Sequence, residues 1–121
     1  MKSKMLVVCL LLSMPSLKAW SQTKVDKFCS VIISMKGGFS SKTIATIHFG
    51  ENDSLFSFKD TSITEKLRRV NSFSNSVDVL NYMSKIGWEF VIIAPIKLYG
   101  TDIEKIYFKK SFDSSELISN N

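Results

Sequence analysis

Apolar and polar residues alternate in two stretches of the first half of the chain. Between residues 25 and 35, one parity carries Val25, Cys29, Val31, Ile33 and Met35. This period of two predicts a β-strand, and residues 43–49, which are rich in β-branched side chains, predict a second one. The glycine pair at 37–38 lies between them, so we expect an antiparallel hairpin. Residues 55–58 are a candidate for a further short strand.

The apolar spacing then lengthens to that of a helix. Positions 77, 80, 83 and 86 are all apolar and lie three residues apart, which predicts one main helix. Either Ser74 or Ser76 would open this helix, and Gly87 supplies a residue that can adopt positive φ just past its end.

The segment between the hairpin and this helix leaves two interpretations open. Residues 59–72 could form one or two helical turns, with Thr61, Ser62 or Thr64 as the N-cap. They could equally form an irregular crossing or an extended edge segment. The sequence pattern alone does not choose between them.

Two more strands are predicted after the helix. Residues 88–98 are strongly apolar, and Pro95 restricts the later half of that strand to an edge or a bulge. Residues 103–112 return as the last strand, and the polar tail 113–121 is expected to fray. The chain therefore predicts an α+β fold, a small antiparallel sheet of about four to five strands with one main helix packed on one face. The other face is expected to be open or to pair with a second copy.

The first 21 residues have the three-part pattern of a secretory signal peptide. Lys2 and Lys4 form a positive start, an apolar run follows, and small residues precede a cleavage point ahead of Gln22. The apolar run, about ten residues long, is too short to span a bilayer as a helix. We therefore expect a leader at 1–21, a single domain at 22–121, and export to the periplasm or the exterior without a stable membrane anchor.

The basic character of the chain decreases once the leader is set aside. The formal charge is +5, and loss of Lys2, Lys4 and Lys18 with the leader leaves +2. Among the remaining basic residues, the pairs Arg68–Arg69 and Lys109–Lys110 are isolated in the sequence. Nucleic-acid binding requires basic residues gathered on one face, so we expect no nucleic-acid partner.

Residues suited to catalysis or metal binding are few. His48 is the only histidine, and a zinc site needs three or four ligands, so we expect neither a metal nor a cofactor. Cys29 lies in an apolar strand and is expected to be a buried structural thiol. The chain contains no glycine-rich phosphate loop and no Gly-x-Ser-x-Gly motif.

One carboxylate has neighbours that could place it in an apolar setting. Glu89 lies between Trp88 and Phe90, and with Asp102 or Glu104 it could form the acid pair that glycoside hydrolysis requires. Strand alternation favours the other arrangement, in which Glu89 points outward while its two aromatic neighbours face the core.

Most of the aromatic residues are expected in the core, because a sheet-plus-helix domain needs them there. Tyr99, near the final turn, and Tyr107, on the minority parity of the last strand, are the candidates for exposed binding contacts.

The segment Asn81–Val91 (Asn-Tyr-Met-Ser-Lys-Ile-Gly-Trp-Glu-Phe-Val) and the run Tyr107–Lys110 resemble a group of small bacterial domains of unknown function. Their pattern is a helix, then Gly-Trp-Glu opening a strand, a turn, and a last strand that ends in an aromatic–basic pair. The chain is more similar still to short exported proteins of the Bacteroides group. The resemblance covers residues 70–112 and implies no activity.

What the resemblance implies is structural. Gly87 ends the helix, Trp88 fastens the helix to the sheet, and Tyr107 and Phe108 pack beside it. Asp53-Ser54-Leu55 also resembles the short O-glycosylation signal of exported proteins in that group, which implies modification at Ser54.

These observations favour an exported, non-catalytic module that binds a protein partner or an envelope ligand, with Tyr99, Tyr107 and Glu89 as candidate contacts. A sheet edge is a template for pairing with a partner or with a second copy. Two alternatives stay open: a small carboxylate-dependent hydrolase acting on envelope glycans, and a periplasmic, antitoxin-like inhibitor that occludes the surface of its partner.

Overall fold

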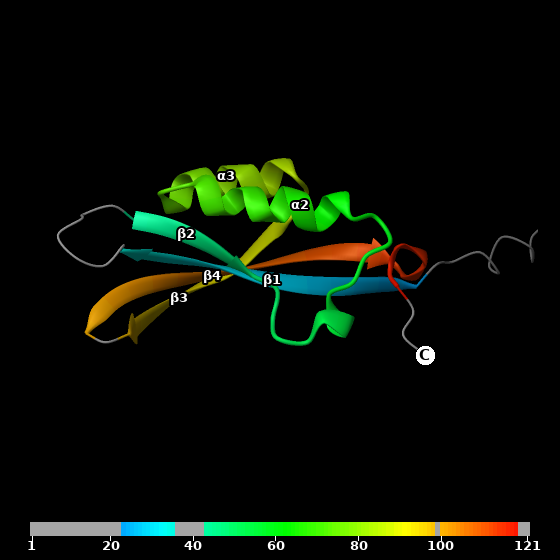
Figure 1. Ribbon diagram of the computed structural model, residues 1–121, viewed down its shortest axis with the longest axis horizontal. Helices are drawn as coiled ribbons and strands as arrows, with labels where there is room; N and C mark the ends of the chain where they lie inside the picture. The colour runs from blue at the N-terminus through cyan, green and yellow to red at the C-terminus, as the bar shows by residue number, and fades with distance from the viewer. Residues whose placement is uncertain (1–22, 36–42, 99, 119–121) are drawn as a thin grey trace, which may run out of the picture.

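The computed structural model describes residues 23–35, 43–98 and 100–118. The expected leader, the glycine pair at 37–38 and Tyr99 lie outside these ranges. Within them, four strands form one antiparallel sheet in the order β2-β1-β4-β3. The strands are β1 (Lys24–Met35), β2 (Thr43–His48), β3 (Glu89–Leu98) and β4 (Thr101–Asp113). Helices α2 (Ser62–Arg68) and α3 (Ser76–Lys85) cover one face of the sheet, so the α+β prediction is confirmed (Figure 1).

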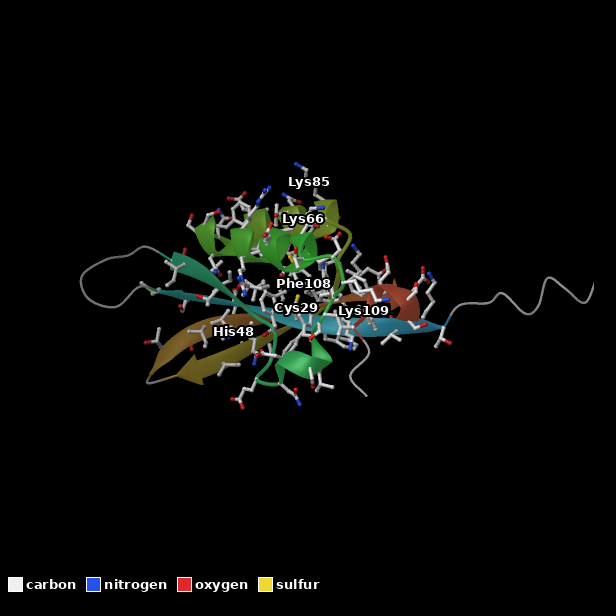
Figure 2. All side chains as sticks on the ribbon, turned by 45° about the vertical axis from the view of Figure 1, so that its right-hand side comes forward. Cys29, His48, Lys66, Lys85, Phe108 and Lys109 are labelled. Atoms are coloured by element: carbon white, nitrogen blue, oxygen red, sulfur yellow. The ribbon has the colours of Figure 1, made fainter. Side chains whose placement is uncertain are left out.

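The core lies between the two helices and the face of the sheet that they cover, which is called the helix face. In the sheet register Cys29 is opposite Phe108 and Val31 is opposite Ile106, so alternate residues of the two central strands point to the helices together. Figure 2 labels Cys29 and Phe108 beneath the helix layer. The helices contribute fully buried side chains of their own: Leu67, Val79 and Met83. The opposite surface of the sheet is called the open face below.

A cluster of aromatic rings fills one end of the core. Trp88 is 3% exposed, and its ring centroid lies 6.1 Å from that of Phe56 and 5.9 Å from that of Phe112. Phe58 packs on Phe112 with a centroid separation of 4.6 Å. The cluster joins the β2–α2 connection to the start of β3 and the end of β4.

The β2–α2 connection contains no strand. Its residues 53–55 form the short helix η2 (Asp53–Leu55), and Phe58 makes a single bridge to Leu117. The strand prediction for 55–58 is therefore wrong, although the alternation behind it is real because Phe56 and Phe58 are both buried. Figure 1 shows this connection passing beside the N-terminal half of β1, where the Lys27 ammonium donates to the Leu55 carbonyl over 2.6 Å.

The ambiguous segment 59–72 is helical. It forms α2 and the following turn η3 (Arg69–Ser72), so the domain has a second helix where one main helix was expected. The Asp60 carboxylate accepts a hydrogen bond from the Ser62 backbone at the start of α2 (3.0 Å). Buried Leu67 and Val70 explain the location of this segment, because they complete the core beneath it.

Helix α3 begins at Ser76, one of the two residues expected to open it, but its N-cap is Asn75. The side chain of Asn75, rather than Ser74 or Ser76, accepts the hydrogen bond from the Asp78 backbone. At the other end, Gly87 has φ of +91°, as the prediction of a glycine stop requires. Val77 is exposed, because the buried stripe of α3 runs through Val79 and Met83 instead.

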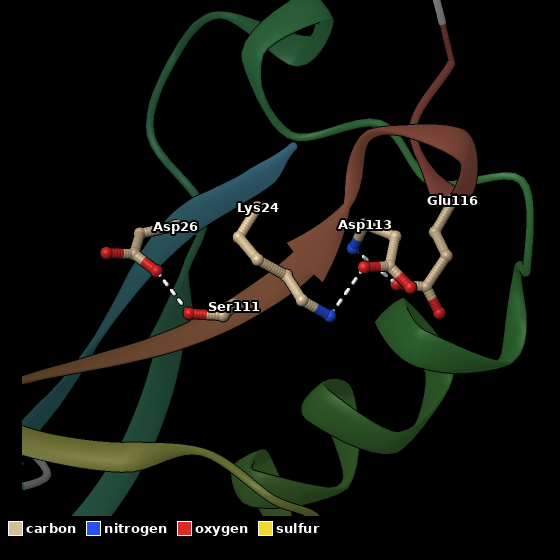
Figure 3. Close-up of polar contacts among 5 residues, drawn as sticks. All are labelled: Lys24, Asp26, Ser111, Asp113 and Glu116. Carbon is tan, nitrogen blue, oxygen red and sulfur yellow. Dashed lines mark hydrogen bonds and ion pairs between the residues drawn. The ribbon is translucent and has the colours of Figure 1, made fainter. Parts of the chain in front are cut away.

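The first part of the C-terminal tail is fixed to the rest of the domain. Lys24 and Asp113 form an ion pair of 2.5 Å, and Asp113 caps the turn η4 (Ser114–Glu116) together with Glu116 (Figure 3). The Ile118 backbone donates to the Ser57 carbonyl. Residues 113–118, which were expected to fray, thus have contacts that attach them to the domain, and residues 119–121 lie outside the described ranges.

Candidate functional site

The two outer strands of the sheet differ in whether the backbone groups at their outer edges have hydrogen-bond partners. At β2 the edge is covered by the segment around η3. The Ile47 backbone donates to the Asn71 side chain over 2.9 Å, and the Ala45 backbone donates to the Phe73 carbonyl over 3.1 Å. The Thr43 hydroxyl donates to the Ser74 carbonyl. These contacts use the hydrogen-bonding groups that another strand would need, so β2 is closed to further pairing.

At β3, by contrast, the described residues make no backbone hydrogen bond except those to β4. Four consecutive apolar side chains are also exposed here: Phe90, Val91, Ile92 and Ile93. Phe90 lies opposite Phe108, on the side of the sheet that carries the helices, but it is 51% exposed and is therefore not part of the core. The reason is its place on an outer strand that the helices cover only in part. An uncapped, apolar edge of this kind is the strongest binding feature of the described surface.

Two features limit how a further strand could pair with β3. The register shifts between Phe90 and Ile92, so Val91 forms a bulge, and Pro95 has no backbone N–H. The prediction that Pro95 marks an edge or a bulge is confirmed by the sheet order. Glu89 at the start of β3 and Lys97 near its end give the edge opposite charges at its two ends.

The candidate carboxylates are not brought together. Glu89 is exposed and lies opposite Lys109, whereas Asp102 and Glu104 lie five to seven positions away along β4. At a strand rise of about 3.3 Å per residue, that separation is about 17 Å or more. Paired glycosidase acids lie no more than about 9.5 Å apart, so this geometry provides no carboxylate pair for hydrolysis.

Tyr107 lies on the open face, away from Trp88. It is in register with Ser30, and Ser30 is in register with His48, so the three side chains form a row across the sheet. The implied packing of Tyr107 beside Trp88 is therefore wrong, while buried Phe108 does point to the helix face. The Lys105 ammonium lies 5.3 Å from the centroid of the Tyr107 ring. These residues line a hollow of about 250 Å³ that contains no carboxylate.

The described residues hold no group of three or more potential metal ligands. Cys29 is buried in the core, and burial raises the pKa of its thiol to about 12, so it is protonated and inert at neutral pH. None of the helices in the described ranges has the length and apolar character needed to cross a membrane.

The sequence analysis missed one group of residues altogether. Lys66, Arg69 and Lys85 come from different parts of the chain, yet they line one hollow between α2 with its following turn and the C-terminal end of α3. Their signal in the sequence is the presence of basic residues in the last turn of each helix. This signal can be recognised only if residues 59–72 are assigned to a helix, and the sequence pattern leaves that assignment open.

Comparison of the chain with protein-family models, with curated proteins and with solved structures found no match. The chemistry of the site is therefore argued from its own geometry.

Proposed function

We propose that this protein is a non-catalytic module that binds an extended, apolar segment of a protein partner along the outer edge of β3. The observation that carries the proposal is the contrast between the two sheet edges. The edge of β2 is capped by Asn71 and Phe73, while β3 exposes four consecutive apolar side chains. A segment added to such an edge is held by main-chain hydrogen bonds and selected through its side chains.

The charges of β3 favour one direction of pairing. An antiparallel segment with a basic residue near Glu89 and an acidic residue near Lys97 would have opposite charges facing at both ends. Because the Val91 bulge and Pro95 shorten the usable edge, apolar contacts with Phe90, Ile92 and Ile93 would supply much of the affinity. A second copy of β3 has the same charge order, so self-pairing has to be distinguished from a separate partner.

We further propose that binding takes place after export. The signal-peptide pattern at 1–21 supports a location in the periplasm or outside the cell. An inhibitor that occludes a partner would use the same edge of β3. The hydrolase alternative receives no support, because Glu89 is distant from Asp102 and Glu104.

The test compares two variants that place a lysine on exposed apolar positions. Ile92→Lys puts a charge at the centre of the proposed edge, and Val77→Lys makes the same change on α3, where 62% of the Val77 side chain is exposed. Protein purified after expression of the full chain is studied by sedimentation equilibrium. Partners captured from envelope and culture fractions are identified, and their affinities are then measured for each variant.

We expect Ile92→Lys to weaken partner binding by about tenfold or more, because the added ammonium would be desolvated, and Val77→Lys to leave binding unchanged. Self-association that only Ile92→Lys abolishes would identify a second copy as the occupant. Equal affinity in both variants would contradict the proposal, as would a monomer that captures no partner. Thermal unfolding of both variants verifies that they are folded.

A further inference from the structure

A hollow of about 510 Å³ lies between the C-terminal end of α3 and the neighbouring α2 with its following turn. Its walls come from α2 and its following turn on one side and from the end of α3 on the other. The lining residues are Lys66, Arg69, Tyr82, Lys85, Ile86 and Gly87. Figure 2 shows Lys66 and Lys85 on the helix layer, above the sheet, so this hollow is separate from the edge of β3.

All the charged side chains that line the hollow are basic. Lys66, Arg69 and Lys85 line it, and none of its lining residues is acidic. Lys110 joins them from β4, because a smaller adjoining hollow is lined by both Lys66 and Lys110. Within the described ranges, none of these four cations forms an ion pair with a carboxylate.

The C-terminal end of a helix attracts cations, and that effect alone could place a lysine in the last turn of each helix. It does not explain why the cations converge, because two of the nearby carbonyls already have partners. The Lys66 carbonyl accepts a hydrogen bond from the Tyr82 hydroxyl over 2.6 Å, and the Ile86 carbonyl accepts one from the Lys110 ammonium over 3.3 Å. Lys66, Arg69 and Lys85 thus line a hollow that has no carboxylate in its lining to neutralise them.

The Tyr82 hydroxyl also fixes the shape of the hollow. It belongs to α3 and its acceptor belongs to α2, so this bond ties the two walls together. Phe73 packs on the Tyr82 ring with a centroid separation of 5.1 Å and restricts it further. A site held in this way requires little rearrangement when a ligand enters.

We propose that this hollow binds a phosphate group, with the Arg69 guanidinium and the Lys66 and Lys85 ammonium groups as its donors. Three cations suit a phosphomonoester, which has up to two negative charges and three terminal oxygens. Arginine can donate to two of these oxygens at once, and each lysine adds a single charge-assisted bond. The phosphate group could belong to a soluble compound or to a lipid headgroup, and the experiment distinguishes these sources.

The test is an amide NMR titration of protein purified after expression of the full chain. Inorganic phosphate is the probe, sodium chloride at matched ionic strength is the blank, and acetate is the monovalent comparison. We expect saturable shifts of the Lys66, Arg69, Lys85 and Gly87 amides. Lys66→Gln, Arg69→Gln and Lys85→Gln should each weaken phosphate binding by about tenfold. Lys59→Gln removes an exposed cation from the β2–α2 connection, outside the lining of the hollow, and should leave phosphate binding unchanged.

Vesicles of phosphatidylcholine with and without phosphatidic acid then separate the two sources. Binding to the acidic vesicles that Arg69→Gln abolishes identifies a lipid headgroup, whereas phosphate binding without vesicle binding identifies a soluble phosphate compound. The proposal is overturned if phosphate moves none of these amides beyond the chloride blank. It is also overturned if Lys59→Gln weakens binding as much as Arg69→Gln does, because that would be general attraction to surface charge.

Discussion

The side-chain oxygen of Asn71 lies 2.9 Å from the backbone nitrogen of Ile47 and accepts its hydrogen bond. A side chain thus takes the place that a neighbouring strand would have at the edge of β2. The Phe73 carbonyl accepts the next outward amide, that of Ala45. With this edge occupied, β3 on the other side of the sheet is the outer strand to which we assign the proposed pairing.

Removing the Asn71 side chain should uncover the edge of β2. We expect Asn71→Ala to lower the free energy of unfolding by about 1 kcal/mol, the usual net contribution of one hydrogen bond. Hydrogen exchange at the Ile47 amide should become faster. The Ala45 amide is the internal control, because its acceptor belongs to the backbone and remains. Unchanged protection of Ile47 would mean that Asn71 does not cap this edge.

Two glycines with similar backbone geometry provide a matched pair for testing the end of α3. Gly50 has φ of +88° with no atom within 4 Å of an added Cβ, whereas at Gly87 the Lys110 ammonium would lie 3.3 Å away. Gly50→Ala should cost about 1 kcal/mol from left-handed backbone strain alone. Gly87→Ala should cost more, because Lys110 must also move from the Ile86 carbonyl. Chemical denaturation measures both; equal losses would show that the Lys110 contact is unimportant.

The contribution of the start of α2 to the stability of the fold should depend on pH. Hydrogen bonds from the Ser62 side chain and backbone hold the pKa of Asp60 below its usual 3.8. The ionised carboxylate therefore stabilises the fold above pH 3.8, and this contribution is lost as the pH falls through the lowered pKa. Asp60→Asn should be less stable than wild type at neutral pH, and the difference should shrink in acid. Ser62→Ala, which keeps the backbone bond, should show a smaller effect. A difference that is constant with pH would contradict this assignment.

The buried Cys29 thiol should resist modification. Since burial raises its pKa to about 12, iodoacetamide should label the native protein far more slowly than free cysteine at pH 8. Labelling should accelerate in denaturant, in step with unfolding followed by fluorescence. Rapid labelling under native conditions would place Cys29 outside the core.

Local sequence patterns were sufficient to predict most of the sheet. The alternation in residues 25–35 and the apolar run after Gly87 correctly predicted β1 and β3, and Pro95 correctly indicated an edge. Alternation predicts which residues share a face of the sheet, but it does not predict whether another element covers that face. For this reason it wrongly indicates a core position for Phe90. Its exposure follows from the position of β3 at the edge of the sheet, which depends on long-range pairing.

The candidate sites were harder to predict for the same reason. Glu89 and Asp102 are close enough in sequence to suggest a pair, yet the antiparallel return of β4 carries Asp102 to the opposite end of β3. The hollow between α2 and α3 depends on helix packing, so Lys66 and Lys85 gave no joint signal. The tail was expected to fray because it is polar, but the pairing of Lys24 with Asp113 and the bridge from Phe58 to Leu117 attach it.

The pairing of β1 with β4 has a consequence for how the chain acquires its structure. Strands β1 and β4 are the two central neighbours of the sheet. Lys24 lies opposite Asp113, although the two residues are at nearly opposite ends of the domain's sequence. A hairpin of β1 and β2 can form early, but the core beneath the helices cannot close until β4 arrives. Sheets that depend on such distant contacts fold slowly. A chain synthesised from its N-terminus would thus remain open, and able to pass through a narrow channel, until its last strand is complete.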